Sequence, residues 1–254
     1  MKLKIRYLNI CKIFPLLLFI FSSCGPQYYN PIKQNVKVFE KKGDIVASIS
    51  AQPFFNQLSI DAGYSLTNNI GINTSYNRFN KSIYGGETNL FVKDFMWDNE
   101  LIFYKNFKFG LFGAANLGYG RGGFNVCNPY YRLSMDRFYA QPSIGYMLFD
   151  RLGIAFSTRF SQSLYNVKMH TDGYSESEKQ MIQSYFGLTD IEKKAFFIEP
   201  AVTLIVKNDN YAWKLQYIQS YTDSEYNDYG YENLILTYSL NLSNLLFHEK
   251  TKTN

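Results

Sequence analysis

Alternation of apolar and polar side chains with a period of two is the feature that most constrains the fold of this chain. Residues 57–79, QLSIDAGYSLTNNIGINTSYNRF, place Leu58, Ile60 and further apolar side chains on one face and small or polar side chains on the other. This period is typical of a half-buried strand. The alternation is interrupted at residues 67–69, Thr-Asn-Asn, and asparagine tolerates the positive φ of a tight turn. The stretch therefore predicts a β-hairpin with one apolar, aromatic face and one small, polar face.

The same pattern recurs and predicts ten strands. Connections after the second, fourth, sixth and eighth strands are short, whereas those after the third, fifth, seventh and ninth are long. Short periplasmic turns and long outer loops are typical of outer-membrane barrels, so we expect an all-β, closed antiparallel up-and-down barrel. An even strand count places both chain ends on the turn side. The expected strands span residues 44–52, 57–66, 70–80, 97–104, 108–119, 137–149, 152–165, 195–207, 211–221 and 231–242.

The two faces of these strands predict an apolar wall toward lipid and a polar lumen. Charges in a narrow lumen must pair or contact water, because an isolated buried charge is costly. We therefore expect an internal polar network that fills and stiffens the barrel, with a proton or ion pathway as the alternative. Its expected members are Asp61, Gln141, Arg159, Glu199, Lys214 and Gln216.

Residues 1–23 predict a lipoprotein signal peptide. They carry four cations and no acid, and their apolar run, 13–21, is shorter than the roughly 20 residues of a membrane-spanning helix. Phe21-Ser-Ser-Cys24 resembles the lipobox of bacterial lipoproteins, although an aliphatic residue is usual in place of Phe21. The resemblance implies covalent diacylglycerol and acyl chains on Cys24. The alternative is ordinary secretory cleavage that leaves Cys24 free.

The rest of the chain divides into three parts. Residues 24–43 contain two prolines, several amides and no sustained periodicity, which predicts a lipidated N-terminal tether. The alternative for this part is a segment that folds back and plugs the barrel, with Tyr28 and Tyr29 as anchors. We expect the β-barrel over residues 44–243 and a polar C-terminal tail over residues 244–254.

Charge and cysteine content argue against two classes of protein, nucleic-acid-binding proteins and disulfide-stabilised domains. The formal net charge is +5, and the four leader cations account for most of it. A basic patch or stripe of the kind that binds nucleic acid is absent from the sequence, so we expect no nucleic-acid partner. Cys11 lies in the leader and Cys127 has no evident partner, which excludes a disulfide framework.

Several stretches resemble a group of largely uncharacterised β-barrel lipoproteins from Bacteroidota. The run YNPIKQNVKVFEKKGDIVASISAQ, the hairpin LSIDAGYSLTNNIGI, and QPSIGY and EPAVTL carry the likeness, which spans nearly the whole mature chain. These motifs lie at strand ends and turns. The resemblance therefore implies a location in the cell outer membrane and a barrel architecture, and it supplies no functional residues.

Aromatic and helical features are expected near the ends of the barrel. Residues 175–187, SESEKQMIQSYFG, have a capping box and an apolar stripe, which predict a short helix in the longest outer loop. Loop tyrosines could contact glycans or proteins, and they are Tyr130, Tyr131, Tyr226, Tyr229 and Tyr231. Interfacial girdles are expected from Tyr104, Phe107, Tyr119, Tyr165, Tyr211, Trp213 and Tyr221.

The sequence offers little that could support catalysis. Its two histidines, His170 and His248, lie in a loop and in the tail, and His170 with Ser161 or Ser163 is the only nearby pair for acid–base chemistry. We see no metal motif or phosphate loop, and expect neither cofactor nor metal. We therefore expect a non-catalytic outer-membrane lipoprotein with a structural or surface-interaction role. The alternatives are a narrow channel or small-molecule-binding barrel, and a lipid-tethered soluble lipocalin-like barrel.

Overall fold

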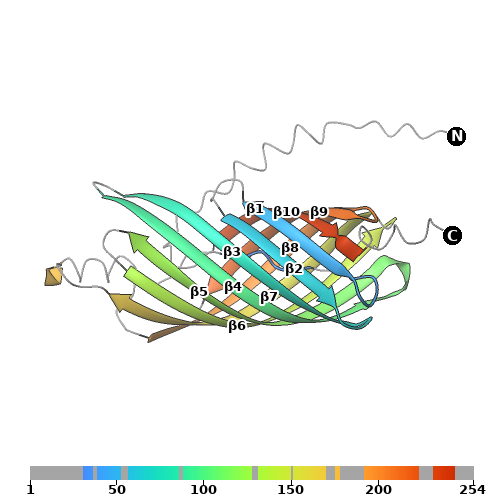
Figure 1. Cartoon of the computed structure of the whole chain (residues 1–254), viewed down its shortest axis with the longest axis horizontal. Coiled ribbons are helices and arrows are strands. Elements are labelled where there is room, and N and C mark those ends of the chain that lie inside the picture. The colour runs from blue at the N-terminus through green and yellow to red at the C-terminus, as the bar shows by residue number, and fades with distance from the viewer. Residues whose placement is uncertain are drawn as a thin grey trace.

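The chain forms a closed barrel of ten antiparallel strands in the computed structural model (Figure 1). Each strand pairs with its neighbours in sequence, and β1 pairs with β10 to close the sheet. The structure describes residues 31–36, 39–52, 57–85, 88–127, 131–149, 151–169, 175–177, 192–222 and 231–243. The strands are β1 (Ile45–Gln52), β2 (Gln57–Ser65), β3 (Ile70–Gly85), β4 (Thr88–Asn106), β5 (Leu111–Cys127), β6 (Tyr131–Leu148), β7 (Leu152–Met169), β8 (Glu192–Lys207), β9 (Tyr211–Thr222) and β10 (Tyr231–Asn241).

The barrel has two distinct ends. At the turn end, the strands are joined by residues 66–69, 107–110, 149–151 and 208–210. The remaining connections lie at the opposite end, here called the loop end, where β3 to β7 project farthest in Figure 1. The predicted all-β, up-and-down barrel is confirmed. Within the described residues, no helix is long and apolar enough to cross a membrane.

The central strands extend farther toward the loop end than predicted. The expected loops 81–96 and 120–136 are wrong over most of their length, since β3 pairs with β4 up to Gly85 opposite Thr88. Arg121 is an exposed outward position of β5, and the backbone ladder between β4 and β5 continues past it to Cys127. The apolar outward residues that mark a membrane-facing strand can therefore stop before the strand itself ends.

Two local predictions differ from the structure or lie partly beyond it. Residues expected to open the fifth strand form the short helical turn η1 (Lys108–Gly110), and β5 begins at Leu111. Phe109 has a φ of 63° and is 90% exposed, so it does not belong to the outer face of a strand. Of the helix expected over residues 175–187, residues 176 and 177 are helical, and residues 178–187 lie outside the described residues.

The outer wall carries an apolar belt that begins at the turn end. In β8 it runs from Phe196 to Val206, about the 9 to 11 residues that a tilted strand needs to cross a bilayer. Nearer the loop end, β8 presents the exposed Lys194. A soluble lipocalin-like barrel would need a polar exterior, so that alternative is wrong. The exposed belt includes Leu58, Ile60, Ile72, Trp97, Leu117, Phe138, Ile144, Phe156, Leu204 and Trp213.

The interior is occupied by an N-terminal segment of the chain. Residues 31–36 are buried and bond to side chains of the inner wall, and residues 39–44 lie at the turn end. The expected solvated tether over residues 24–43 is therefore wrong for residues 31–36, which correspond to the alternative of a plugging segment. Residues 24–30, with Cys24, Tyr28 and Tyr29, lie outside the described residues.

Candidate functional site

The six residues predicted to form a lumen network all point into the barrel. Asp61, Gln141, Arg159, Glu199 and Gln216 are at most 2% exposed, and Lys214 is half-buried. Arg159 lies 3.9 Å from the Glu199 carboxylate and donates to Gln141 Oε1 at 3.1 Å. Asp61 pairs instead with Lys33 of the N-terminal segment. These residues therefore meet through residues 31–36, hereafter the lumen segment.

The wall binds the backbone of the lumen segment at every residue. Each of its six carbonyl oxygens accepts a hydrogen bond from a wall side chain, and the Gln34 amide also donates to Gln216 Oε1 at 2.8 Å. A buried carbonyl without a partner is costly, so these bonds make burial of irregular backbone favourable. The donors, at 2.6 to 3.3 Å, are Asn233 for Pro31, Arg159 for Ile32 and Lys33, Gln216 for Gln34, Asn116 and Gln141 for Asn35, and Lys214 for Val36.

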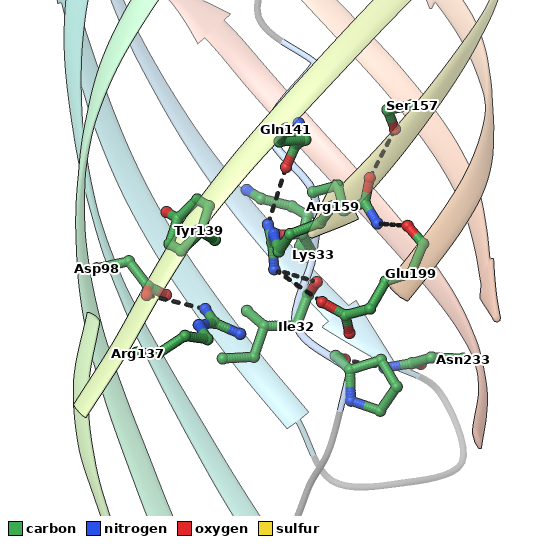
Figure 2. A network of polar contacts seen from close by, with 12 residues as sticks. Ile32, Lys33, Asp98, Arg137, Tyr139, Gln141, Ser157, Arg159, Glu199 and Asn233 are labelled. Carbon is green, nitrogen blue, oxygen red and sulfur yellow. Dashed lines mark hydrogen bonds and ion pairs between the residues drawn. The ribbon is translucent and has the colours of Figure 1, made fainter. Parts of the chain in front are cut away.

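Side chains of the lumen segment add a second set of contacts. Gln34 Nε2 donates to the Glu199 carbonyl at 2.5 Å, and its Oε1 accepts from Ser157 at 2.7 Å. Asn35 Nδ2 donates to Glu100 Oε2 at 2.8 Å. Figure 2 shows the polar residues converging on the segment from several strands. Nearer the turn end the contacts become apolar, where Val36 clusters with Phe112, Met147, Ala155 and Ile205.

The sequence prediction missed a second polar cluster on β4 and β6. Arg137 donates to Asp98 at 2.8 Å (Figure 2). The Tyr139 hydroxyl donates to Glu100 Oε1 at 2.8 Å. The guanidinium carbons of Arg137 and Arg159 lie 5.0 and 4.7 Å from the Tyr139 ring centroid, within cation–π range. A Cβ at Gly118 would overlap this ring, so glycine makes the space for Tyr139.

A sequence signal for this cluster exists in the alternation itself. Trp97, Leu101 and Phe138 face outward, and their immediate neighbours must therefore face the lumen. That step assigns Asp98, Glu100 and Arg137 to the interior without further information. Lys33 carried no such signal, because its segment has no periodicity.

The turn end is closed by residues that precede β1. Phe39 packs against Tyr104 with ring centroids 5.3 Å apart, and Asn106 Nδ2 donates to the Phe39 carbonyl at 2.9 Å. A Cβ at Gly71 would lie 2.6 Å from the Phe39 ring. The Asp44 carboxylate accepts from the backbone amides of residues 40 and 41, at 2.7 and 3.0 Å. This cap fixes the path from the lumen into β1.

Two residues expected in the aromatic girdles belong to the interior instead. Tyr104 and Tyr165 are 4% and 3% exposed, because their strand positions have inward parity. The other expected girdle residues are exposed, and they are Phe107, Tyr119, Tyr211, Trp213 and Tyr221. Of the loop tyrosines, Tyr131 and Tyr231 begin β6 and β10, and Tyr130, Tyr226 and Tyr229 lie outside the described residues.

Space beside the lumen segment is narrow. The gap between its central residues and the wall formed by β1 and β8 to β10 measures about 10 Å³, close to the room for one water molecule. A larger cavity of about 70 Å³ lies at the turn end, beside Val36, Met147 and Ile205. The contacts around residues 31–36 therefore leave little room for solute beside the segment.

The described residues add no support for catalysis. His170 and His248 lie outside the described residues, whereas Ser161 and Ser163 are buried on the inner wall. Among the residues that the structure describes, no group of three or more His, Cys, Asp or Glu side chains could hold a metal ion. Cys127 is the last residue of β5.

Comparison with known proteins gives likeness in architecture only. No family model and no curated protein matches the chain. An outer membrane channel from Pseudomonas putida F1 is 10% identical, with a TM-score of 0.45, and the match covers 83% of this chain and 99% of that one. The β domain of the Bordetella autotransporter BrkA is 10% identical, with a TM-score of 0.43 and coverage of 79% and 99%. The translocator domain of the autotransporter NalP from Neisseria meningitidis is 8% identical, with a TM-score of 0.41 and coverage of 78% and 88%. Likeness at this level carries no information on what the barrel binds or transports.

Proposed function

We propose that the chain is an integral barrel of the cell outer membrane, lipidated at Cys24, with a non-catalytic structural or surface-interaction role. The apolar belt supports the membrane location, because it matches the thickness that a tilted strand must cross. The lipobox-like sequence before Cys24 supports lipidation. Contacts with glycans or proteins would form at the loop end.

The observation that carries the closed, structural role is the occupied lumen. An open channel needs a continuous water-filled path, and the centre of this barrel holds the lumen segment with all six of its carbonyls bonded to the wall. Among the residues that the structure describes, inward charges are paired or hydrogen-bonded, as for Arg137 with Asp98 and Glu100 with Asn35. We therefore expect the native barrel to pass no steady ionic current.

A gated narrow channel is the second candidate. It is favoured by one observation, namely that the lumen is filled by a separate segment rather than by wall side chains alone. Displacement of residues 31–36 would leave an inner wall lined by Asn, Gln and charged groups, which water can enter.

Conductance in planar lipid bilayers tests both candidates. The variants are a deletion of residues 25–38, which joins Cys24 to Phe39, and a control deletion of residues 249–254 in the tail. We expect the native protein and the tail deletion to be silent and the first deletion to conduct. Steady conductance by the native protein would contradict the closed role. A silent but folded 25–38 deletion, with the β-sheet circular dichroism of the native barrel, would eliminate the gated channel.

A further inference from the structure

The lumen segment runs in a defined direction through the barrel. Its first residue, Pro31, accepts a hydrogen bond from Asn233, which lies two residues from the loop-end start of β10. Asn233 also bonds to Gln57, the loop-end first residue of β2. Phe39 contacts Tyr104 and Asn106 at the opposite, turn end. The chain therefore descends from the loop end to the turn end before β1 begins.

The chain that precedes Pro31 has a single way out of the barrel. The ten strands form a closed sheet, which leaves no lateral opening in the ladder. Below Pro31 the lumen is filled by Ile32, Lys33, Gln34, Asn35 and Val36, which are all buried. Two segments cannot share this space, because protein interiors are close-packed. From Pro31, the direction that the described residues leave open is toward the loop end.

We propose that the barrel delivers its own N-terminus to the loop side of the membrane, so that the acyl chains on Cys24 insert into the outer leaflet. This inference rests on the proposed membrane location and lipidation. It differs from the default expectation of the even strand count, which places both chain ends on the turn side.

Chain length excludes the opposite leaflet. Six residues lie between Cys24 and Pro31, and the seven residue-to-residue steps from one to the other span at most about 25 Å in an extended chain. To reach the turn-side leaflet it would have to rise to the rim and descend along an outer belt about 25 Å tall. That descent would also expose unpaired backbone groups to hydrocarbon, where they have no partners. To reach the loop-side leaflet, the chain neither descends along the belt nor exposes backbone groups to hydrocarbon.

The test is labelling of single cysteines with a membrane-impermeant maleimide on intact and on permeabilised cells. Each variant carries Cys127→Ser, and the acylated Cys24 has no free thiol. The reporter is Tyr28→Cys, four residues from Cys24. The controls are Glu176→Cys, which is exposed at the loop end, and Asp209→Cys, which is exposed in a turn-end connection. A parallel culture receives a labelled fatty acid, with Cys24→Ala as its control.

We expect Tyr28→Cys to label on intact cells to the same extent as Glu176→Cys, and Asp209→Cys to label only after permeabilisation. Labelling of Tyr28→Cys only after permeabilisation, or in neither state, would overturn the inference. Protection of Glu176→Cys on intact cells would instead refute the proposed membrane orientation. Absence of acyl incorporation would refute lipidation and with it the anchor in the outer leaflet, while the direction of the chain would still be decided by the Tyr28→Cys result.

Discussion

Replacement of Lys33 by methionine should destabilise the barrel more than any surface charge change. Lys33 pairs with Asp61 inside the lumen, where their side chains are 6% and 0% exposed. Removal of one partner leaves a buried charge without its compensating ion, which costs about 3 to 5 kcal/mol. Methionine keeps the apolar stem of lysine, so little packing is lost. In the double variant Lys33→Met with Asp61→Asn, we expect more than half of this loss to be recovered, because the uncompensated carboxylate is gone.

Lys207→Met is the matched control. Lys207 pairs with Glu40 at 3.0 Å at the turn end, where their side chains are 24% and 57% exposed. Exposed pairs contribute at most about 1 kcal/mol. The free energy of unfolding is measured by urea titration of barrels refolded in lipid vesicles, and the fluorescence of Trp97 and Trp213 follows the transition. A Lys33→Met barrel within about 0.5 kcal/mol of the native one would refute the buried pair and the path of the lumen segment.

Three further measurements test the wall of the barrel. Gly118→Ala should cost about 1 to 3 kcal/mol, because its Cβ would overlap the Tyr139 ring, whereas Gly113→Ala has room and should cost less than about 1 kcal/mol in the same titration. Val202→Arg places a charge in the apolar belt and should cost about 2 to 4 kcal/mol, and a neutral result would place the bilayer elsewhere. Both tryptophans lie on the outer wall, so brominated acyl chains should quench most of the native fluorescence, and quenching by aqueous acrylamide alone would contradict the assigned faces.

Alternation made the barrel predictable from sequence. Leu58, Ile144 and Leu204 face outward as expected, because a period of two fixes the parity of each strand position once one face is known. The same rule predicts only the part of each strand that crosses the membrane, because only there must the outward face be apolar. Toward the loop end the outward positions of β5 include the exposed, charged Arg121, so the apolar half of the pattern stops while the strand continues to Cys127.

The position of the lumen segment could not be predicted, because its six residues, PIKQNV, have the composition of a solvated linker. A linker exposes its carbonyls to water, and this segment exposes them to hydrogen-bond donors of the wall, so the two environments select the same residue types. The inner wall, however, contains more than charged side chains that pair with one another. Asn116, Gln141, Gln216 and Asn233 point inward, and each donates an amide hydrogen bond to the backbone of the segment.

These inward amides suit a lumen that holds peptide backbone. Amide side chains carry both a donor and an acceptor, and can therefore bond to a backbone carbonyl or amide. A buried peptide backbone supplies carbonyl acceptors at every residue, and Asn and Gln donate to them without the desolvation cost of a charge. In this chain the inward amides of β5, β6, β9 and β10 donate to carbonyls of its own N-terminal segment, while Arg159 and Lys214 donate to the others.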